Sequence, residues 1–372
     1  MKRARFLAGL LMTLLFSMCT SPKQEVGEAL PQFDVADALN AALPDTFTWN
    51  SIAKDARTVP LKTEHLIGGT PRVQYFSDDL IIVSDFDTKR IFLFDDEGRE
   101  KVSFSHYGQG PKEYLYMTKV NYHERDSLIM LYDGGKNKLF RFDLQGNFVD
   151  VRHMDTGGTV LKIDSEGTMF SVNQTGESFI SIWDDKLELK GECLPFDTCF
   201  NDRQKIGFQM LSGKGFIGSE FKVLPATGDT VYSITKEGAH PVCVLDRGRY
   251  KCVTEKLGDD RMLSNPDYLI GESLSFFSSY FYYLANSKTV AELWDMNTGK
   301  LLAWNRGVQG SSEYDWIWGF RYVFPSGNEI RPNRFDYVTK NRGVFILQAD
   351  ECLDDVEGLN ADDNPVLLVL EF

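Results

Sequence analysis

The chain has 372 residues and a formal net charge of −14 at neutral pH. An acidic surface repels the phosphates of nucleic acid, and there is no basic stretch to offset it, so we expect no nucleic-acid partner. The acidity itself is best explained by solubility, because net charge does not indicate where a binding site lies. Aromatic residues make up 13% of the chain, which favours β-strands, where such side chains fit a half-buried pleat.

The N-terminus has the form of an export signal. Residues 1–18 begin with three basic side chains and continue with an apolar run from Phe6 to Phe16, which is too short to span a bilayer. Cys19 follows, so the segment resembles a bacterial lipoprotein signal. That resemblance implies a lipid anchor on Cys19, most simply in the outer membrane, facing the periplasm or the cell exterior. Ordinary secretion is the alternative, since Phe16 and Met18 differ from the usual Leu-Ala-Gly.

Residues 19–45 are predicted to be a polar tether and a short N-terminal segment, with a short helix at Asp34–Leu43. Five further cysteines follow Cys19. Cys193 and Cys199 could close a small loop, but their spacing does not decide whether they pair. No Cys-x-x-Cys or His-Cys grouping with zinc spacing occurs, so we predict no metal ligands of that kind.

Two segments repeat one pattern. Leu80–Gly98 and Leu128–Gly146 each contain an apolar run, a polar turn, a second apolar run and an Asp-x-x-Gly turn. This is the pattern of a β-hairpin followed by a tight turn. The second copy begins 48 residues after the first, and a strand-only repeat of that length indicates propeller blades.

We therefore predict an all-β fold for residues 46–372, a six-bladed β-propeller of four-stranded antiparallel blades. Pro195–Lys205 and Arg247–Asp267 are interpreted as long connections. The expected strands are Val73–Phe76, Leu80–Ser84, Arg90–Phe94 and Lys101–Ser105 in the first blade; four strands within Met117–Val151 in the second; Thr159–Ile163, Met169–Val172, Phe179–Trp183 and Leu187–Leu194 in the third; Gly215–Glu220, Thr230–Thr235 and His240–Asp246 in the fourth; Leu269–Leu274, Phe276–Tyr283, Val290–Asp295 and Leu301–Asn305 in the fifth; and Gly319–Phe324, Phe335–Thr339, Val344–Gln348 and Val366–Phe372 in the sixth.

The ends of the chain should close the ring. Thr46–Trp49 and Arg57–Thr63 are expected to be short strands. An open ring would leave an unpaired strand edge, so we predict that Arg57–Thr63 pairs with the final run, Val366–Phe372.

The motif Gln-Gly-x-x-Glu-Tyr occurs twice, 200 residues apart. In blades of about 50 residues this places both copies at equivalent crossings on one face. We interpret these crossings as a candidate binding face, with Trp316 and Trp318 offering stacking surfaces. The alternative is structural: the glycines allow a turn, Glu113 accepts backbone N–H groups and the aromatic residues pack between blades. The candidate residues are Gln109, Glu113, Tyr114, Gln309, Glu313, Tyr314, Trp316 and Trp318.

No catalytic residue is assigned. Asp85, Asp133 and Asn173 recur after the second strand of each blade, which favours turn caps over calcium ligands. There is no Gly-x-Ser-x-Gly motif. The five histidines (His65, His106, His123, His153 and His240) are scattered, and only His106 lies near the candidate face. Paired carboxylates from distant blades stay open as a catalytic possibility.

Three segments carry a resemblance to a family. Tyr107–Tyr114, Asp229–Ile234 and Asp363–Leu367 resemble the six-bladed β-propeller lipoproteins of Gram-negative gut anaerobes, and the blades are more distantly similar to NHL-type repeats. The resemblance covers about Arg57 to Phe372 and implies fold and anchoring more than activity. We expect a monomeric, lipid-anchored, non-catalytic propeller without a cofactor that binds a protein, peptide or glycan on one face. The alternative is a calcium-dependent hydrolase or lactonase, or a lyase acting on sugars, with its site at the central channel.

Overall fold

The computed structural model describes residues 29–372 except 42–45, 155–157, 219, 260, 263–264, 266, 271, 286–289, 310–315, 318 and 333. Cys19 and the predicted leader lie outside these residues. Pro31–Phe372 form one compact unit, which is described here by itself. No helix among the described residues is long and apolar enough to cross a membrane.

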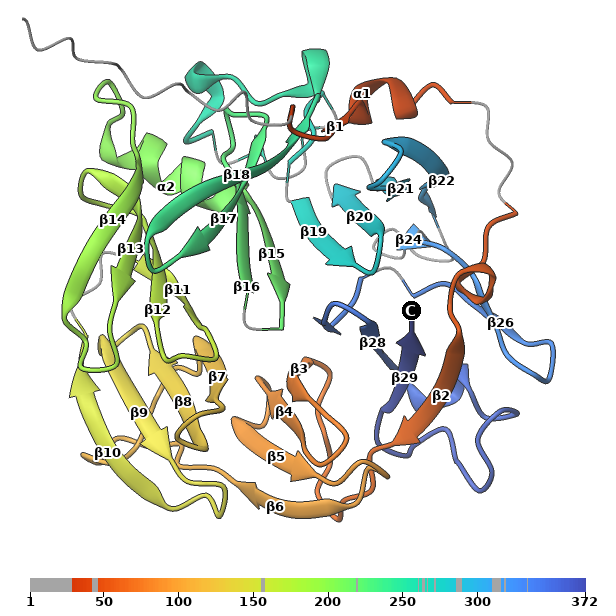
Figure 1. Cartoon of the computed structure of the whole chain (residues 1–372). Helices are drawn as coiled ribbons and strands as arrows, with labels where there is room; N and C mark the ends of the chain where they lie inside the picture. The colour runs from red at the N-terminus through yellow and green to blue at the C-terminus, as the bar shows by residue number, and fades with distance from the viewer. Residues whose placement is uncertain are drawn as a thin grey trace, which may run out of the picture. The chain divides into compact units, whose positions relative to one another are not determined.

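Four-stranded antiparallel sheets arranged around a common centre make up most of the unit (Figure 1). Each strand pairs with its neighbour in the chain, which is the expected result of hairpin repeats. The sheets are β3 (Pro71–Phe76), β4 (Ile81–Asp85), β5 (Arg90–Phe94) and β6 (Glu100–Phe104); β7 (Lys119–His123), β8 (Leu128–Asp133), β9 (Lys138–Phe142) and β10 (Phe148–His153); and β11 (Gly158–Ile163), β12 (Met169–Asn173), β13 (Ser178–Trp183) and β14 (Leu189–Pro195).

The next two groups of strands are joined into one nine-stranded sheet. The join is a parallel contact between β15 and β19 at Lys214 and Ser273. Gly215 permits this close approach, because a Cβ there would lie 2.1 Å from the Leu274 carbonyl oxygen. The members are β15 (Gly213–Ile217), β16 (Glu220–Leu224), β17 (Thr230–Thr235), β18 (Gly238–Leu245), β19 (Glu272–Phe277), β20 (Tyr280–Ala285), β21 (Val290–Asp295), β22 (Lys300–Arg306) and β1 (Gln32–Phe33), which pairs with β18 in parallel.

A further four-stranded sheet brings the two ends of the unit together. β2 (Asp55–Pro60) pairs antiparallel with β29 (Val366–Glu371), which also pairs with β28 (Arg342–Leu347), followed by β27 (Tyr337–Val338). The predicted pairing with the final run is thus observed for Arg57–Pro60; the first strand begins two residues before the predicted Arg57 and ends three residues before the predicted Thr63. Val366 to Leu370 are completely buried, and each such side chain contributes roughly 1.5–3 kcal/mol through burial.

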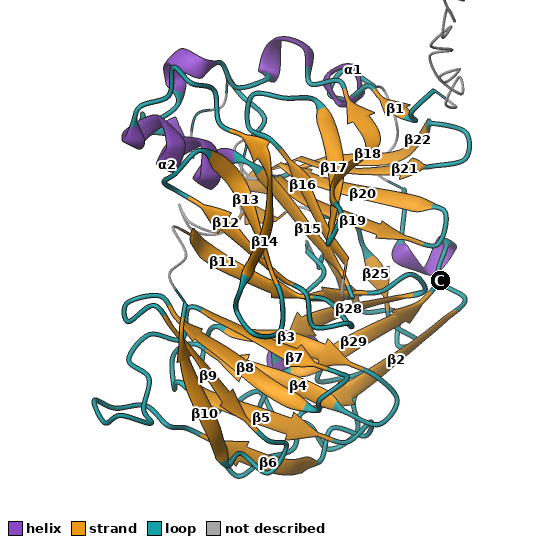
Figure 2. Ribbon diagram, turned by 60° about the vertical axis from the view of Figure 1, so that its left-hand side comes forward, coloured by secondary structure: helices purple, strands orange, loops and turns teal. Residues whose placement is uncertain are grey.

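Short helices and two small sheets complete the unit. Figure 2 shows helices α1 and α2 on the outside of the strands. The described helices are α1 (Val35–Ala38), α2 (Asp202–Leu211) and the 3-10 helices Trp49–Ser51, Gly248–Tyr250, Thr254–Lys256 and Ala349–Glu351. The small sheets pair β23 (Val308–Gln309) with β24 (Trp316–Ile317), and β25 (Tyr322–Val323) with β26 (Glu329–Ile330).

The N-terminal segment belongs to this unit, which therefore begins earlier than the expected boundary at residue 46. Phe33, Val35 and Ala38 are buried in the largest apolar cluster, and removing such side chains from water favours their packing against the sheet. Trp49 is also completely buried there. The predicted strand Thr46–Trp49 is wrong, because Thr48 makes only an isolated bridge to Arg321 and Trp49 starts a 3-10 helix.

Several predicted strands need correction. Gly215–Glu220 spans the end of β15 and the start of β16 rather than one strand. Phe276–Tyr283 contains a turn at Ser278, which adopts a φ of 48°, so its first two residues belong to β19. Gly319–Phe324 contributes β25 to a small sheet, not to the sheet of β28 and β29. The expected connection Pro195–Lys205 runs into α2.

Candidate anion-binding site

A cavity of about 380 Å³ lies among the inner strands. Its walls come from the strands β3, β7, β15, β19 and β27. These strands belong to different sheets or to the two halves of the nine-stranded sheet, so the lining is assembled from distant parts of the chain: one residue each from β3 and β7, two from β27, three from β15 and four from β19. Concave sites of this size, with a few convergent polar groups, are typical ligand pockets.

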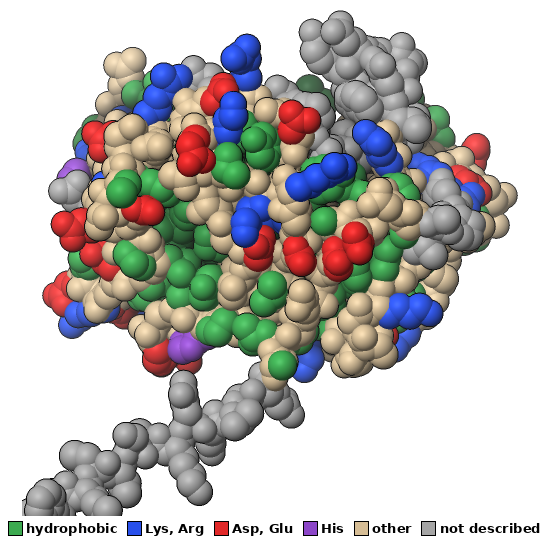
Figure 3. Space-filling view, turned by 90° about the horizontal axis from the view of Figure 1, so that it is seen from above, with side chains coloured by type: hydrophobic (Ala, Val, Ile, Leu, Met, Phe, Trp, Pro, Cys, Tyr) green, Lys and Arg blue, Asp and Glu red, His purple; other side chains and the backbone are tan. Residues whose placement is uncertain are grey.

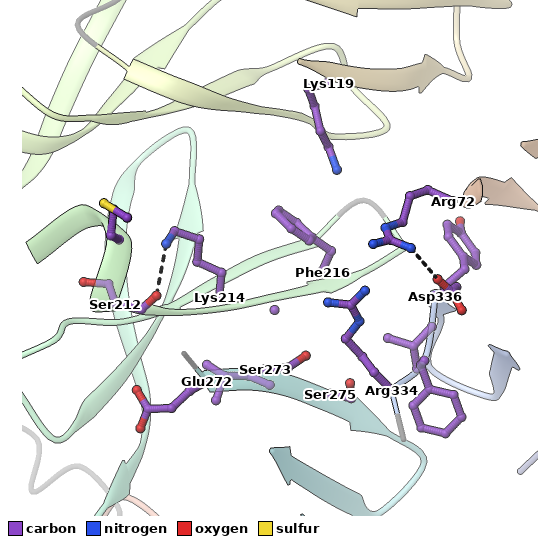
Figure 4. A pocket seen from close by; sticks show the side chains of 16 residues that line it. Arg72, Lys119, Ser212, Lys214, Phe216, Glu272, Ser273, Ser275, Arg334 and Asp336 are labelled. Carbon is purple, nitrogen blue, oxygen red and sulfur yellow. Dashed lines mark hydrogen bonds and ion pairs between the residues drawn. The ribbon is translucent and has the colours of Figure 1, made fainter. Parts of the chain in front are cut away.

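Cationic side chains dominate the charged lining of this cavity. Arg72 comes from β3, Lys119 from β7, Lys214 from β15, and Arg334 from the segment before β27. Figure 4 shows the ends of Lys119, Arg72 and Arg334 pointing toward the same open space. The protein as a whole is acidic, and acidic and basic side chains are interspersed on the face in Figure 3. The cavity therefore carries a local excess of positive charge in a protein whose net charge is negative.

The two carboxylates in the lining already have partners. Glu272 accepts hydrogen bonds from Arg247 at 3.1 Å and from the Tyr283 hydroxyl at 2.7 Å. Asp336 accepts a hydrogen bond from the Ile346 backbone at 3.0 Å and lies 3.9 Å from Arg72. These contacts leave Lys119, Lys214 and Arg334 without a carboxylate partner among the described residues.

Lys119 is the least compensated of these cations. Its ammonium lies 5.0 Å from the centre of the Phe216 ring, and the ammonium of Lys162 lies 5.4 Å from the same ring. No hydrogen-bond acceptor contacts the Lys119 ammonium in the described part of the chain. Desolvation, followed by repulsion from Arg72 and Arg334, lowers the pKa of Lys119 to about 8. A cation–π contact contributes only about 0.5–2 kcal/mol, which does not offset the desolvation of the ammonium. A bound anion would therefore stabilise this group.

Two further lysines also have lowered pKa values: Lys214 in the cavity lining and Lys162 beside the Phe216 ring. Desolvation and the charge of Lys119 lower the pKa of Lys162 to about 7. Desolvation lowers the pKa of Lys214 to about 8, although its ammonium donates to the Gln209 and Ser212 carbonyl oxygens at 2.6 and 3.0 Å. Desolvation by the surrounding cavity also lowers the pKa of Arg334, although the residue itself is exposed. Converging like charges in a partly desolvated cavity raise the local positive potential, which an anionic ligand would neutralise.

The four cationic residues of the cavity lining were not predicted as a site, because each cation is isolated in the sequence. A signal was nevertheless present in the repeat. Arg72 faces Ser84, the residue before Asp85, and Lys119 faces Tyr132, the residue before Asp133. A basic residue at matching positions of the first strands could therefore have indicated a cationic channel.

The first copy of the Gln-Gly-x-x-Glu-Tyr motif serves the fold. Glu113 accepts a hydrogen bond from the Gly110 backbone at 2.7 Å. Tyr114 is completely buried and donates to the Lys89 carbonyl oxygen at 2.7 Å. Tyr114 is thus a core residue and cannot belong to an accessible face, because no part of it reaches solvent. Gln109 is exposed, and its place on a binding face stays a prediction.

The second copy gives no test of the binding face. Glu313, Tyr314 and Trp318 lie outside the described residues. Gln309 pairs with Trp316 between β23 and β24, and their side chains are not among those described. None of these residues lines the cavity as far as the described residues define it.

The repeated Asp side chains are turn caps, as predicted. Asp85 accepts hydrogen bonds from the backbone of Gly68 at 2.7 Å and of Asp87 at 3.0 Å. Asp133 accepts from Leu115 and Gly135 at 2.8 and 3.0 Å. Asn173 instead donates to the Ser178 carbonyl oxygen. Within the described ranges, no three His, Cys, Asp or Glu side chains are grouped as a metal site would require.

Comparisons with known proteins give a family but no activity. Residues 30–371 match the model of a domain of unknown function, DUF4934. The chain belongs to this family. No curated protein matches this DUF4934 chain.

Among the similar solved structures, one with a TM-score above 0.5 supports the fold. A candidate exported protein from Bacteroides fragilis is 12% identical, with a TM-score of 0.65 over 92% of this chain and 99% of that one. Virginiamycin B lyase from Staphylococcus aureus is 8% identical, with a TM-score of 0.45 over 86% and 99% of the two chains. BamB from Moraxella catarrhalis is 10% identical, with a TM-score of 0.43 over 86% and 100%.

Proposed function

We propose that this DUF4934 chain is an exported, lipid-anchored propeller that binds an anionic ligand in its central cavity without transforming it. The observation that carries the proposal is the convergence of Arg72, Lys119, Lys214 and Arg334 on one cavity of an acidic protein. Guanidinium and ammonium groups are the protein's usual partners for carboxylate, sulfate and phosphate. Lys119 and Arg334 have no hydrogen-bonding partner in the described residues, so both are free to donate to a ligand.

We further propose that the unit is a closed propeller of six blades. In this account the nine-stranded sheet is two blades joined at β15 and β19, and β1 is an addition to its edge. The pairing of β2 with β29 supports closure, since it removes an open strand edge. The lipid anchor on Cys19 is supported by the basic and apolar residues before it. A Cys19→Ser variant should move from the membrane fraction to the soluble fraction, and an unchanged membrane fraction would contradict the anchor.

The test of binding is calorimetric titration with citrate, a compact ligand that carries three carboxylates and a hydroxyl group. We expect Lys119→Gln and Arg334→Gln each to lower citrate affinity at least tenfold, because a hydrogen bond to a charged group contributes about 1.5–3 kcal/mol. Lys256→Gln is the matched control, since Lys256 is exposed on a 3-10 helix and absent from the cavity lining. Binding that is absent, or equally weakened by the control, would contradict the proposal.

A further inference from the structure

A second cavity adjoins the first and extends the cationic lining. It has a volume of about 290 Å³ and shares three residues with the central cavity, Arg72, Arg334 and Asp336. Arg331, Gln348 and Glu351 line only the second cavity. Each cavity alone lies near the lower end of the roughly 300–1,000 Å³ that ligand pockets span. Together they form a longer site.

Positive charge is distributed along the length of this site. Lys119 and Lys214 lie in the central cavity, Arg72 and Arg334 line both cavities, and Arg331 lies in the second. A single compact anion could contact only part of such a set. The distribution matches a ligand that carries several negative charges at intervals.

The remaining lining suits hydroxyl groups. Ser273 and Ser275 line the central cavity, and Gln348 lines the second. Asp336, at the junction of the two, offers an acceptor beside the cations. The oxygens of a sulfate or phosphate group could accept from the serine hydroxyls and the Gln348 amide, but such a ligand brings no donor for the Asp336 carboxylate or the Gln348 carbonyl oxygen. A chain of sugar rings that carry both hydroxyl and carboxylate groups satisfies both parts of the lining.

We propose that the two adjoining cavities together bind an acidic oligosaccharide whose uronate carboxylates are spaced along its length. This inference rests on the proposed anion binding and adds the ligand class. The carboxylate at one end meets Lys119 and Lys214, and the next ones meet Arg334 and Arg331. Arg331 already donates to the Gly319 carbonyl oxygen at 3.3 Å, which holds its side chain at the second cavity.

The experiment is calorimetric titration of the purified protein with galacturonic acid and its linear oligomers of two to five residues, together with mannuronate oligomers of the same lengths. We expect affinity for at least one series to rise at least tenfold from the monomer to the trimer and then to level off. Arg331→Gln should remove this gain while leaving monomer affinity within about twofold of the parent. Arg249→Gln, at an exposed position on another segment, should leave both values unchanged.

The outcomes separate the inference from the proposed function. If citrate binds in a Lys119-dependent manner but neither uronate series gains affinity with length, the extended site is wrong and anion binding stands. A gain with length that survives Arg331→Gln also overturns the extended site. If neutral oligomers of equal length bind as well as the uronates, charge does not select the ligand and the inference fails. If citrate, monomers and oligomers all fail to bind, the proposed function itself is refuted.

Discussion

Replacing Lys119 with methionine should make the ligand-free protein more stable and a poorer anion binder. Methionine keeps most of the length and apolar volume of the lysine stem but removes the charge. The folded protein holds the ammonium with a pKa of about 8, against an ordinary value of 10.5. That difference corresponds to roughly 3 kcal/mol of cost at neutral pH.

The net gain is smaller than this cost. The substitution also removes the contact between the ammonium and the Phe216 ring at 5.0 Å, which contributes about 0.5–1 kcal/mol. The side chain is partly exposed to the cavity, so solvent screens part of the penalty. We expect Lys119→Met to raise the free energy of unfolding by about 1–2 kcal/mol at pH 7.

Urea unfolding at several pH values measures this change. Since the folded pKa lies below the unfolded one, the destabilisation is fully present below pH 8 and disappears as the pH rises through about 8 to 10.5. The difference between variant and parent should therefore shrink toward pH 10. A variant that is less stable than the parent at pH 7, or a difference that does not change with pH, would refute the reasoning.

Three further predictions use other residues. Citrate affinity should fall at least tenfold between pH 6.5 and 9.5, because the two cavity lysines, Lys119 and Lys214, have pKa values of about 8 and lose their charge over that range; a flat profile in calorimetry would contradict this. Deleting Val366–Phe372 should abolish cooperative urea unfolding, since β29 lies between β2 and β28, and a truncated chain that melts like the parent would disprove it. Tyr114→Phe should lose about 1 kcal/mol of stability with its hydrogen bond to Lys89 but bind citrate normally. Reduced binding by that variant at unchanged stability would return Tyr114 to the binding face.

Much of the fold was predictable because hairpin repeats are local. The strands Arg90–Phe94, Thr230–Thr235 and Val290–Asp295 have the predicted bounds, since each is an apolar run ended by a turn. The turn at Ser278 was missed because serine with a positive φ gives no glycine signal. Helix α2 was also missed, although the capping box formed by Asn201 and Gln204 could have indicated where it begins.

The site was harder to predict than the fold because it is not local. Arg72, Lys119, Lys214 and Arg334 come together only when strands from separate sheets meet at the centre. Each alone is an ordinary basic residue in or beside a strand, and net charge gives no hint of them. Glu113 and Tyr114 were predicted as binding residues because their motif occurs twice, but recurrence in a repeat protein usually reflects the repeated packing. The hydrogen bonds of both residues in the structure are of that kind.

The most direct test of the central claim is anomalous diffraction from crystals soaked in selenate, an anion that can be located by its scattering. Binding in the cavity predicts a peak within hydrogen-bonding distance of the Lys119 ammonium and the Arg334 guanidinium, and loss of that peak in the Lys119→Gln variant. Selenate peaks confined to outer surfaces, with none in the cavity, would contradict the account.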